Sequence, residues 1–187
     1  MKDIKEETKK SSIKDLHPLG KISLWLDRYE DIFSDFDPRP FSERALSVDF
    51  LDEAKRASRE KKGNISVNLL IPLYIRDLKK EITIKKRLKE HFKKHYTEVH
   101  EEYKKVLRRG FAFVISGIVL MFIATFILFT FKDSSLLTTF LVILLEPGGW
   151  FLFWEGLDLI IFESKKKKPS LDFYKKMSRA FIEFDSY

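Results

Sequence analysis

The fold is decided by two apolar stretches, GFAFVISGIVLMFIATFILFTF at residues 110–131 and LLTTFLVILLEPGGWFLFWEGLDLIIF at residues 136–162. Four residues, KDSS at 132–135, separate them. A helix needs roughly 20 apolar residues to cross the hydrocarbon core of a bilayer, and each stretch is long enough. Because a backbone in lipid must satisfy its own hydrogen bonds, two helices joined by a tight turn are expected. The sequence therefore predicts a membrane-embedded helical hairpin.

Basic residues flank this hairpin at its outer ends and are scarce in its turn, which holds Lys132 alone. Those outside the hairpin are Lys104, Lys105, Arg108 and Arg109 before it and Lys165, Lys166, Lys167 and Lys168 after it. Lys and Arg near the ends of a span favour the cytoplasmic side. We therefore expect two spans in a cell inner membrane, with both termini in the cytoplasm. The N-terminus lacks the apolar segment of a cleavable signal, so the first span is expected to direct insertion.

The net charge of +7 is unevenly distributed along the chain. The segments outside the hairpin carry 34 basic and 24 acidic residues, a net charge of +10. Each Lys or Arg near an anionic inner leaflet gains about 1 kcal/mol, so the lipid bilayer is the expected partner of this charge. Nucleic-acid binding is not expected, because no supporting motif is present. The absence of cysteine excludes disulfides, thiolate chemistry and Cys-based zinc sites.

The segment at 21–109 has the pattern of an α+β region that ends in a long helix. Residues 22–27 alternate as in a strand, although the same region also fits a helical stripe, and we favour the strand. Ser47 is predicted to cap a helix that ends near Lys62. Residues 65–71 form a β-rich run. From residue 76 to 107 a charged helical pattern is expected to continue into the first span as a stalk.

The remaining segments complete the expected organisation. Residues 1–20 are charged and are predicted to be a disordered tail. At 163–187 we expect a short helix that starts after Pro169, then a strand over residues 181–187. Both flanking segments are expected to build one small cytoplasmic α+β domain with about three strands and two to three helices. Its strand–helix–strand opening favours a parallel pair.

Several short motifs resemble those of a family of uncharacterised prokaryotic two-span membrane proteins. They are DFDPRP at residues 35–40, ALSVDFL at 45–51, EPGGWF at 146–151 and WEG at 154–156. The resemblance covers the chain from about residue 21 onward. It implies the two-span organisation, and it implies no activity, ligand or catalytic residue.

Glu146 is the most informative single residue of the hairpin, because it falls near the middle of the second span. A carboxylate at this depth is costly and is by default a hypothesis of a functional site. Pro147 leaves one carbonyl without its helical donor, and Gly148 and Gly149 allow another backbone to come close. One interpretation is a proton- or cation-responsive carboxylate that lines a pore in a homo-oligomer. We favour the other, a protonated Glu146 bonded to Thr125 or to the freed carbonyl, because no second charge lies at this depth.

Small residues recur every seven positions along both spans: Gly110, Gly117 and Ala124 on the first, Gly149 and Gly156 on the second. This spacing keeps them on one seam, which predicts close packing within the hairpin.

Two further acidic residues, Glu155 and Asp158, point away from this seam near the cytoplasmic end of the second span. We expect them to form a charge-paired interface with Arg108 and Arg109, or with Lys165, and we favour this over the alternative of a ligand site.

One stripe on the stalk, His91, His95, Glu98 and Glu102, has a spacing that permits a His/Glu metal site. Its basic neighbours favour a solvated network of side-chain pairs instead. The acidic residues around the DFDPRP motif are interpreted as caps and solvated side chains. No metal or other cofactor is expected, and no catalytic motif is present.

The sequence therefore favours a non-enzymatic protein, a membrane-tethered interaction or scaffold module whose cytoplasmic domain binds a protein partner. The alternative is a self-assembling pore or transport-like protein that uses Glu146. A membrane-anchored hydrolase is third, and it would need a pocket with converging Asp or His residues.

Overall fold

The computed structural model describes residues 20–61, 63–131 and 135–187. These residues form two compact units, which divide inside helices α3 and α5. The first unit runs up to Tyr96 and resumes with Asp172–Tyr187, and the second is Thr97–Leu171. The predicted tail lies outside the described residues apart from Gly20, which is the first residue of a strand and not part of a tail. Residues 132–134 of the predicted turn also lie outside them.

A three-stranded parallel sheet organises the first unit. Its strands are β1 (Gly20–Trp25), β2 (Ile65–Ile71) and β3 (Phe181–Ser186), in the spatial order β1-β2-β3. In register, Val67 pairs with Ile22 and Ile182 on either side of it. The three predicted strands and the parallel first pair are confirmed, and so is the strand at residues 22–27, although it ends earlier, at Trp25. A 3-10 turn over Tyr29–Ile32 follows it.

Helix α2 (Val48–Arg59) connects β1 to β2. Ser47 occupies the predicted N-cap position with extended backbone angles, but its side chain makes no capping hydrogen bond. The helix is fixed instead through packing, because Phe50 and Ala54 point into the core. A second 3-10 turn, Leu73–Ile75, leads from β2 to the next helix.

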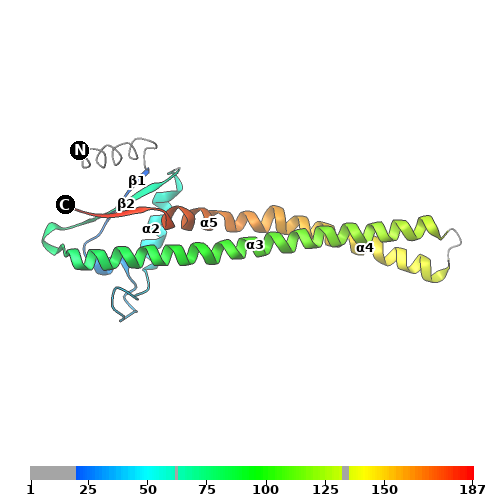
Figure 1. Cartoon of the computed structure of the whole chain (residues 1–187), viewed down its shortest axis with the longest axis horizontal. Helices are drawn as coiled ribbons and strands as arrows, with labels where there is room; N and C mark the ends of the chain where they lie inside the picture. The colour runs from blue at the N-terminus through cyan, green and yellow to red at the C-terminus, as the bar shows by residue number, and fades with distance from the viewer. Residues whose placement is uncertain (1–19, 62, 132–134) are drawn as a thin grey trace, which may run out of the picture. The chain divides into compact units, whose positions relative to one another are not determined.

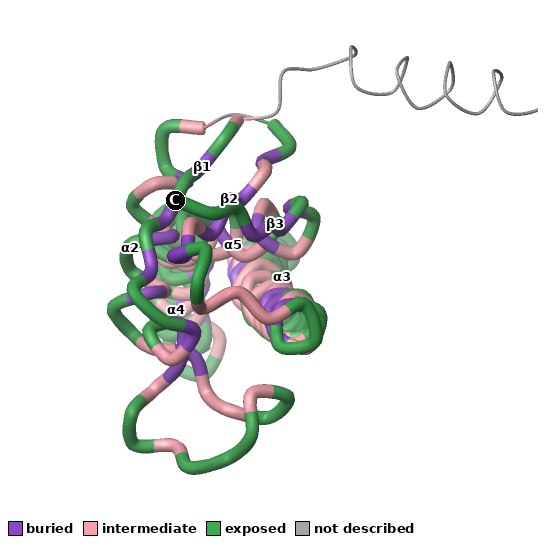
Figure 2. Tube along the Cα trace, turned by 90° about the vertical axis from the view of Figure 1, so that its left-hand side faces the viewer, coloured by how far each residue is buried: buried purple, intermediate pink, exposed green. Residues whose placement is uncertain are grey.

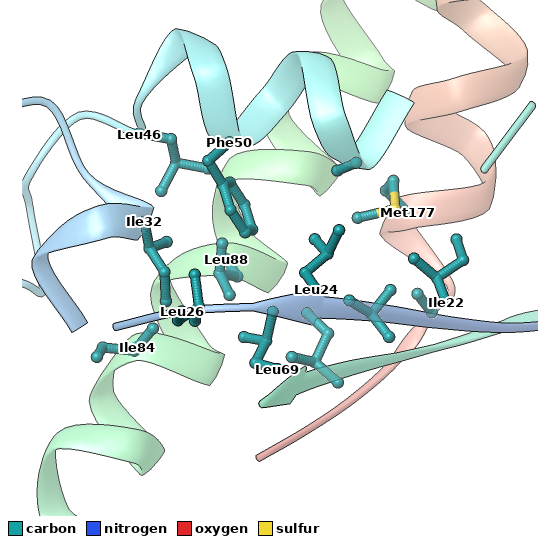
Figure 3. Close-up of a cluster of buried hydrophobic side chains, with 14 of the residues drawn as sticks. Ile22, Leu24, Leu26, Ile32, Leu46, Phe50, Leu69, Ile84, Leu88 and Met177 are labelled. Atoms are coloured by element: carbon teal, nitrogen blue, oxygen red, sulfur yellow. The ribbon is translucent and has the colours of Figure 1, made fainter. Parts of the chain in front are cut away.

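The core of this unit lies on one face of the sheet. Alternate strand residues such as Leu24, Leu69 and Phe184 are buried there. Figure 2 marks the buried parts of the chain in purple. Helix α2, the start of α3 (Leu78–Thr130) and the end of α5 (Ser164–Ser178) pack against them (Figure 3). Their buried apolar residues are Phe50, Ala54, Ile84, Leu88, Phe92, Phe173 and Met177.

Helix α3 is one uninterrupted helix of 53 residues, so the predicted continuation of the charged stalk into the first span is confirmed. In the second unit it lies beside α4 (Leu136–Asp158), as Figure 1 shows. Both helices are long and apolar enough to cross a membrane. In each apolar window 11% of the residues are buried.

Helix α4, the second candidate span, does not end before the C-terminal helix begins. A π-helical turn, Leu159–Glu163, joins α4 directly to α5. The prediction of a helix starting after Pro169 is therefore wrong, since Pro169 lies inside α5. The carbonyl that its ring leaves unpaired belongs to Lys165, which is exposed, so water can solvate it.

Candidate functional site

The sheet of the first unit has a second face, opposite the core. The side chains that alternate with the buried ones lie on it: Lys21, Ser23 and Trp25 from β1, Ser66, Asn68 and Leu70 from β2, and Phe181, Glu183 and Asp185 from β3. We call these nine residues the open sheet face. Trp25 and Phe181 are each 64% exposed. Among the residues that the structure describes, no helix or strand packs over this face.

Local contacts hold the open sheet face in place. The rings of Trp25 and Tyr187 have centroids 3.9 Å apart, and the Tyr187 backbone N–H donates to the Ile71 carbonyl at 3.3 Å. In the middle of the face, the Asn68 side-chain amide donates to Asp185 Oδ2 at 2.7 Å. The face therefore has an ordered, exposed aromatic end, whereas Asn68 at its centre is buried (3% exposed).

An uncovered face is unusual for this kind of sheet. All-parallel sheets occur almost only where both faces are covered, whereas antiparallel sheets commonly leave one face in water. Aromatic side chains fixed on such a face suit recognition of another protein, because Trp and Tyr dominate the energetics of interfaces. The face contains no nucleophile–base pair in hydrogen-bond contact among its described residues.

A buried charged cluster, which sequence reasoning missed, supports the sheet from the core side. Glu81 is 2% exposed, and its carboxylate accepts hydrogen bonds from Arg76 Nε at 2.9 Å and from the Tyr29 hydroxyl at 3.2 Å. Arg76 also donates to the Phe184 carbonyl at 3.2 Å, which ties the start of α3 to β3. Burial raises the pKa of Tyr29, and the Glu81 carboxylate raises the pKa of Arg76.

The DFDPRP motif forms a loop that Asp37 closes. Its carboxylate accepts a hydrogen bond from the Ala45 backbone N–H at 2.7 Å and forms an ion pair with Arg39 at 2.8 Å. These bonds, the one from Arg39 first, hold the pKa of Asp37 well below its usual range. Asp37 therefore stabilises the loop formed by this motif.

In the second unit, the predicted seam of small residues is confirmed. A Cβ added at Gly117 would lie 2.6 Å from the Gly149 carbonyl oxygen, and one at Gly156 would lie 2.6 Å from the Gly110 carbonyl oxygen. Ala124, one seven-residue step further along α3, is fully buried. Close approach of α3 and α4 therefore accounts for these glycines.

The four residues around the proline of α4 lie in different surroundings. Gly149 is buried against α3, whereas Glu146 and Pro147 are exposed. A Cβ added at Gly148 would meet no atom within 4 Å, so packing in the hairpin does not explain this glycine. Glu146 forms no hydrogen bond or ion pair with any described residue. The expected Thr125 partner donates instead to the Met121 carbonyl at 2.9 Å.

The predicted charge-paired residues Arg108, Arg109, Glu155 and Asp158 are all exposed, and the structure brings none of them into an ion pair with a described residue. Glu155 and Asp158 line a shallow hollow on α4 with Trp154.

The ion pairs of this region involve other residues. Lys167 Nζ lies 2.8 Å from Glu102 Oε2, and this bond lowers the pKa of Glu102. Lys166 pairs with Glu163 within α5 and its turn.

His91 and His95 of the stalk stack with Tyr174 of α5 in the first unit. The His91 and His95 rings have centroids 4.2 Å apart, and His95 stacks on Tyr174 at 5.4 Å. Burial, followed by the charges of His95, Arg87 and Lys94, lowers the pKa of His91 to about 4. Within the described part of the chain, no group of three or more His, Cys, Asp or Glu residues is arranged to hold a metal ion.

Comparisons of this chain with protein families, with curated proteins and with solved structures found no match.

Proposed function

We propose that this protein is a non-enzymatic, membrane-anchored interaction module that binds a protein partner through the open sheet face. The hairpin of α3 and α4 anchors it, with both flanking segments in the cytoplasm and the spans in a cell inner membrane. The observation that carries the proposal is the uncovered face of an all-parallel sheet with fixed aromatic side chains.

The sheet itself supports the expected topology. Strand β2 precedes both spans in the sequence and β3 follows both, yet the two strands are paired over six residues. Paired strands must occupy the same compartment, which requires an even number of crossings between them. Two spans meet this requirement, and the basic residues outside the hairpin favour the cytoplasm as that compartment.

Site-specific photocrosslinking in the cells that express the protein tests the proposal. A photoreactive residue replaces Trp25 or Phe181 on the open sheet face. The matched controls replace Phe36 (98% exposed) or Tyr74 (88% exposed), aromatic residues of the same unit outside that face. The expected result is one discrete protein adduct from both face positions and none from the controls.

The identified partner is then purified, and its binding to the full-length protein is measured. Because aromatic anchors dominate interfaces, Trp25→Ser is expected to weaken binding about tenfold or more, whereas Phe36→Ser leaves it unchanged. The proposal fails if the face positions give no adduct, if the controls give the same adduct, or if Trp25→Ser binds as tightly as the unaltered protein.

The exposed position of Glu146 favours a second candidate function, a self-assembled pore or proton pathway. A carboxyl at this depth with no described partner gains from a second copy that supplies one. Proton flux into liposomes that contain the purified protein tests this idea, together with its mass in nanodiscs. A pore requires a discrete oligomer and loses its flux in Glu146→Gln but not in Glu155→Gln. A monomer whose liposomes are as tight as empty ones excludes it.

A further inference from the structure

Cationic side chains gather where the two membrane helices end next to the flanking segments. We call these residues the basic collar: Lys104, Lys105, Arg108 and Arg109 of α3 and Lys165, Lys166, Lys167 and Lys168 of α5. Two contacts within the second unit place both halves at one level. Lys167 is paired with Glu102, and a Cβ at Gly110 would lie 2.7 Å from Ile160 Cγ1.

The acids of the same stretches are already engaged. Residues 101–109 and 163–168 contain three acidic residues, and each pairs with one lysine of the basic collar. The five remaining cations form no ion pair with any described residue: Lys105, Arg108, Arg109, Lys165 and Lys168. Glu155 and Asp158, the acids of the neighbouring hollow, do not pair with them either. The basic collar therefore keeps an excess of positive charge that the protein itself does not neutralise.

The spacing of these cations is unfavourable without an anion. Lys105 and Arg109 are four residues apart on one helical face, and like charges at this spacing destabilise a helix by about 0.2–0.5 kcal/mol. Lys165 and Lys168 repeat the arrangement at three residues on α5. A phosphate between two such side chains would replace repulsion by charge-assisted hydrogen bonds, and the planar guanidinium of Arg109 can bind it through two parallel bonds.

The location identifies the source of that phosphate. Lys105 precedes Gly110 by five residues, which is about 7.5 Å along a helix. The headgroup layer extends about 5–7 Å beyond the hydrocarbon core on each side, so the side chain of Lys105 reaches it. We propose that the basic collar binds the headgroups of anionic phospholipids, with Lys105 and Arg109 sharing one phosphate. The inference rests on the membrane anchor of the proposed function and is independent of the protein partner.

Lipid selectivity of the purified full-length protein tests this assignment. The protein is inserted into vesicles of phosphatidylcholine and phosphatidylglycerol, extracted gently, and its bound lipids are counted by native mass spectrometry. The unaltered protein is expected to retain phosphatidylglycerol in clear excess. Lys105→Gln with Arg109→Gln is expected to reduce this preference about tenfold.

The control Lys79→Gln with Lys89→Gln removes the same charge from exposed positions of α3 in the first unit, and it is expected to keep the preference. Lys105→Arg with Arg109→Lys keeps both charges and should keep the preference too.

Equal retention of both lipids overturns the inference, and so does a preference that survives the double Gln variant. A third contrary outcome is inorganic phosphate at millimolar concentration displacing the lipid, which would point to a soluble anion as the ligand. Protein that never enters vesicles contradicts the membrane anchor itself, whereas protein that enters them without selectivity contradicts this inference alone.

Discussion

Replacing Gly149 or the adjacent Gly148 of α4 with alanine should distinguish the cost of overpacking the α3–α4 seam from the gain in helix propensity. At Gly149 the new Cβ would lie 2.8 Å from Met121 Cγ, 2.9 Å from the Gly117 carbonyl oxygen and 3.1 Å from the Met121 nitrogen. Two of these atoms belong to the backbone of α3, so the clash cannot be relieved by rotation of a side chain. At the adjacent Gly148, the same Cβ meets no atom within 4 Å.

The magnitude follows from the comparison of the two variants. Alanine is a better helix former than glycine by about 0.8–1.0 kcal/mol, and this gain applies at both positions. Overpacking a close contact costs about 1–3 kcal/mol, and this cost applies at Gly149 alone. Gly148→Ala should therefore be neutral or stabilising. Gly149→Ala should be less stable than Gly148→Ala by about 1–3 kcal/mol.

Unfolding of the purified protein in lipid bicelles measures this difference, with Trp150 and Trp154 of the hairpin as fluorescent reporters. Equal stabilities for the two variants would refute the reasoning, because the seam would then tolerate an extra methyl group. A lower stability of Gly148→Ala would refute it as well, and would indicate that another helix packs at this position.

The remaining predictions concern the first unit. Glu81→Gln leaves the Arg76 guanidinium beside a neutral group, so it should lower the free energy of unfolding, measured with denaturant, by about 2–4 kcal/mol. The control Glu90→Gln, at the surface, should change it by less than about 0.5 kcal/mol. Similar values for the two variants would contradict a stabilising buried pair. The folded-state pKa of Asp37 is lowered, so its contribution is present above its usual pKa and is lost as the pH falls. Asp37→Asn should therefore lower the stability at pH 7 and weaken the loss of stability below about pH 4. Thermal unfolding at pH 7 and pH 3 measures both effects. A variant that loses as much stability between these pH values as the unaltered protein would contradict this prediction. Between about pH 6.5 and 4, His91 binds a proton in the unfolded state but not in the folded state, so stability falls as the pH falls. His91→Gln should weaken this pH dependence. Unfolding midpoints measured from pH 7.5 to 4.5 test the prediction.

The sequence was sufficient for features that depend on local periodicity. Alternating apolar residues placed the strands, and the seven-residue spacing of Gly110 and Gly117 indicated the seam, because each pattern is contained in a short window. The charged cluster of Tyr29, Arg76 and Glu81 was not predictable in this way, since its hydroxyl and carboxylate are 52 residues apart in the chain. Only the fold brings them together.

Two predictions about the second apolar stretch and the helix after it differ from the structure for other reasons. The π-helical turn inserts a wide turn between α4 and α5, which no residue pattern indicated, and α5 then continues past Pro169. Pairing of Glu155 and Asp158 with Arg108 and Arg109 was expected from proximity along the spans. The structure instead leaves these four side chains exposed, while Lys167 reaches across to Glu102.

The order of the strands has a consequence for how the protein is made. Strand β2 lies at the centre of the sheet, and its second neighbour, β3, is synthesised after both helices of the hairpin. During synthesis, therefore, one edge of β2 stays unpaired until residues 181–186 have left the ribosome. In the proposed two-span topology, a chain that inserted only one of its two helices would deliver β3 to the wrong compartment and would leave that edge open. An unpaired apolar strand edge promotes aggregation, so in the proposed topology completion of the sheet would report that membrane insertion has succeeded.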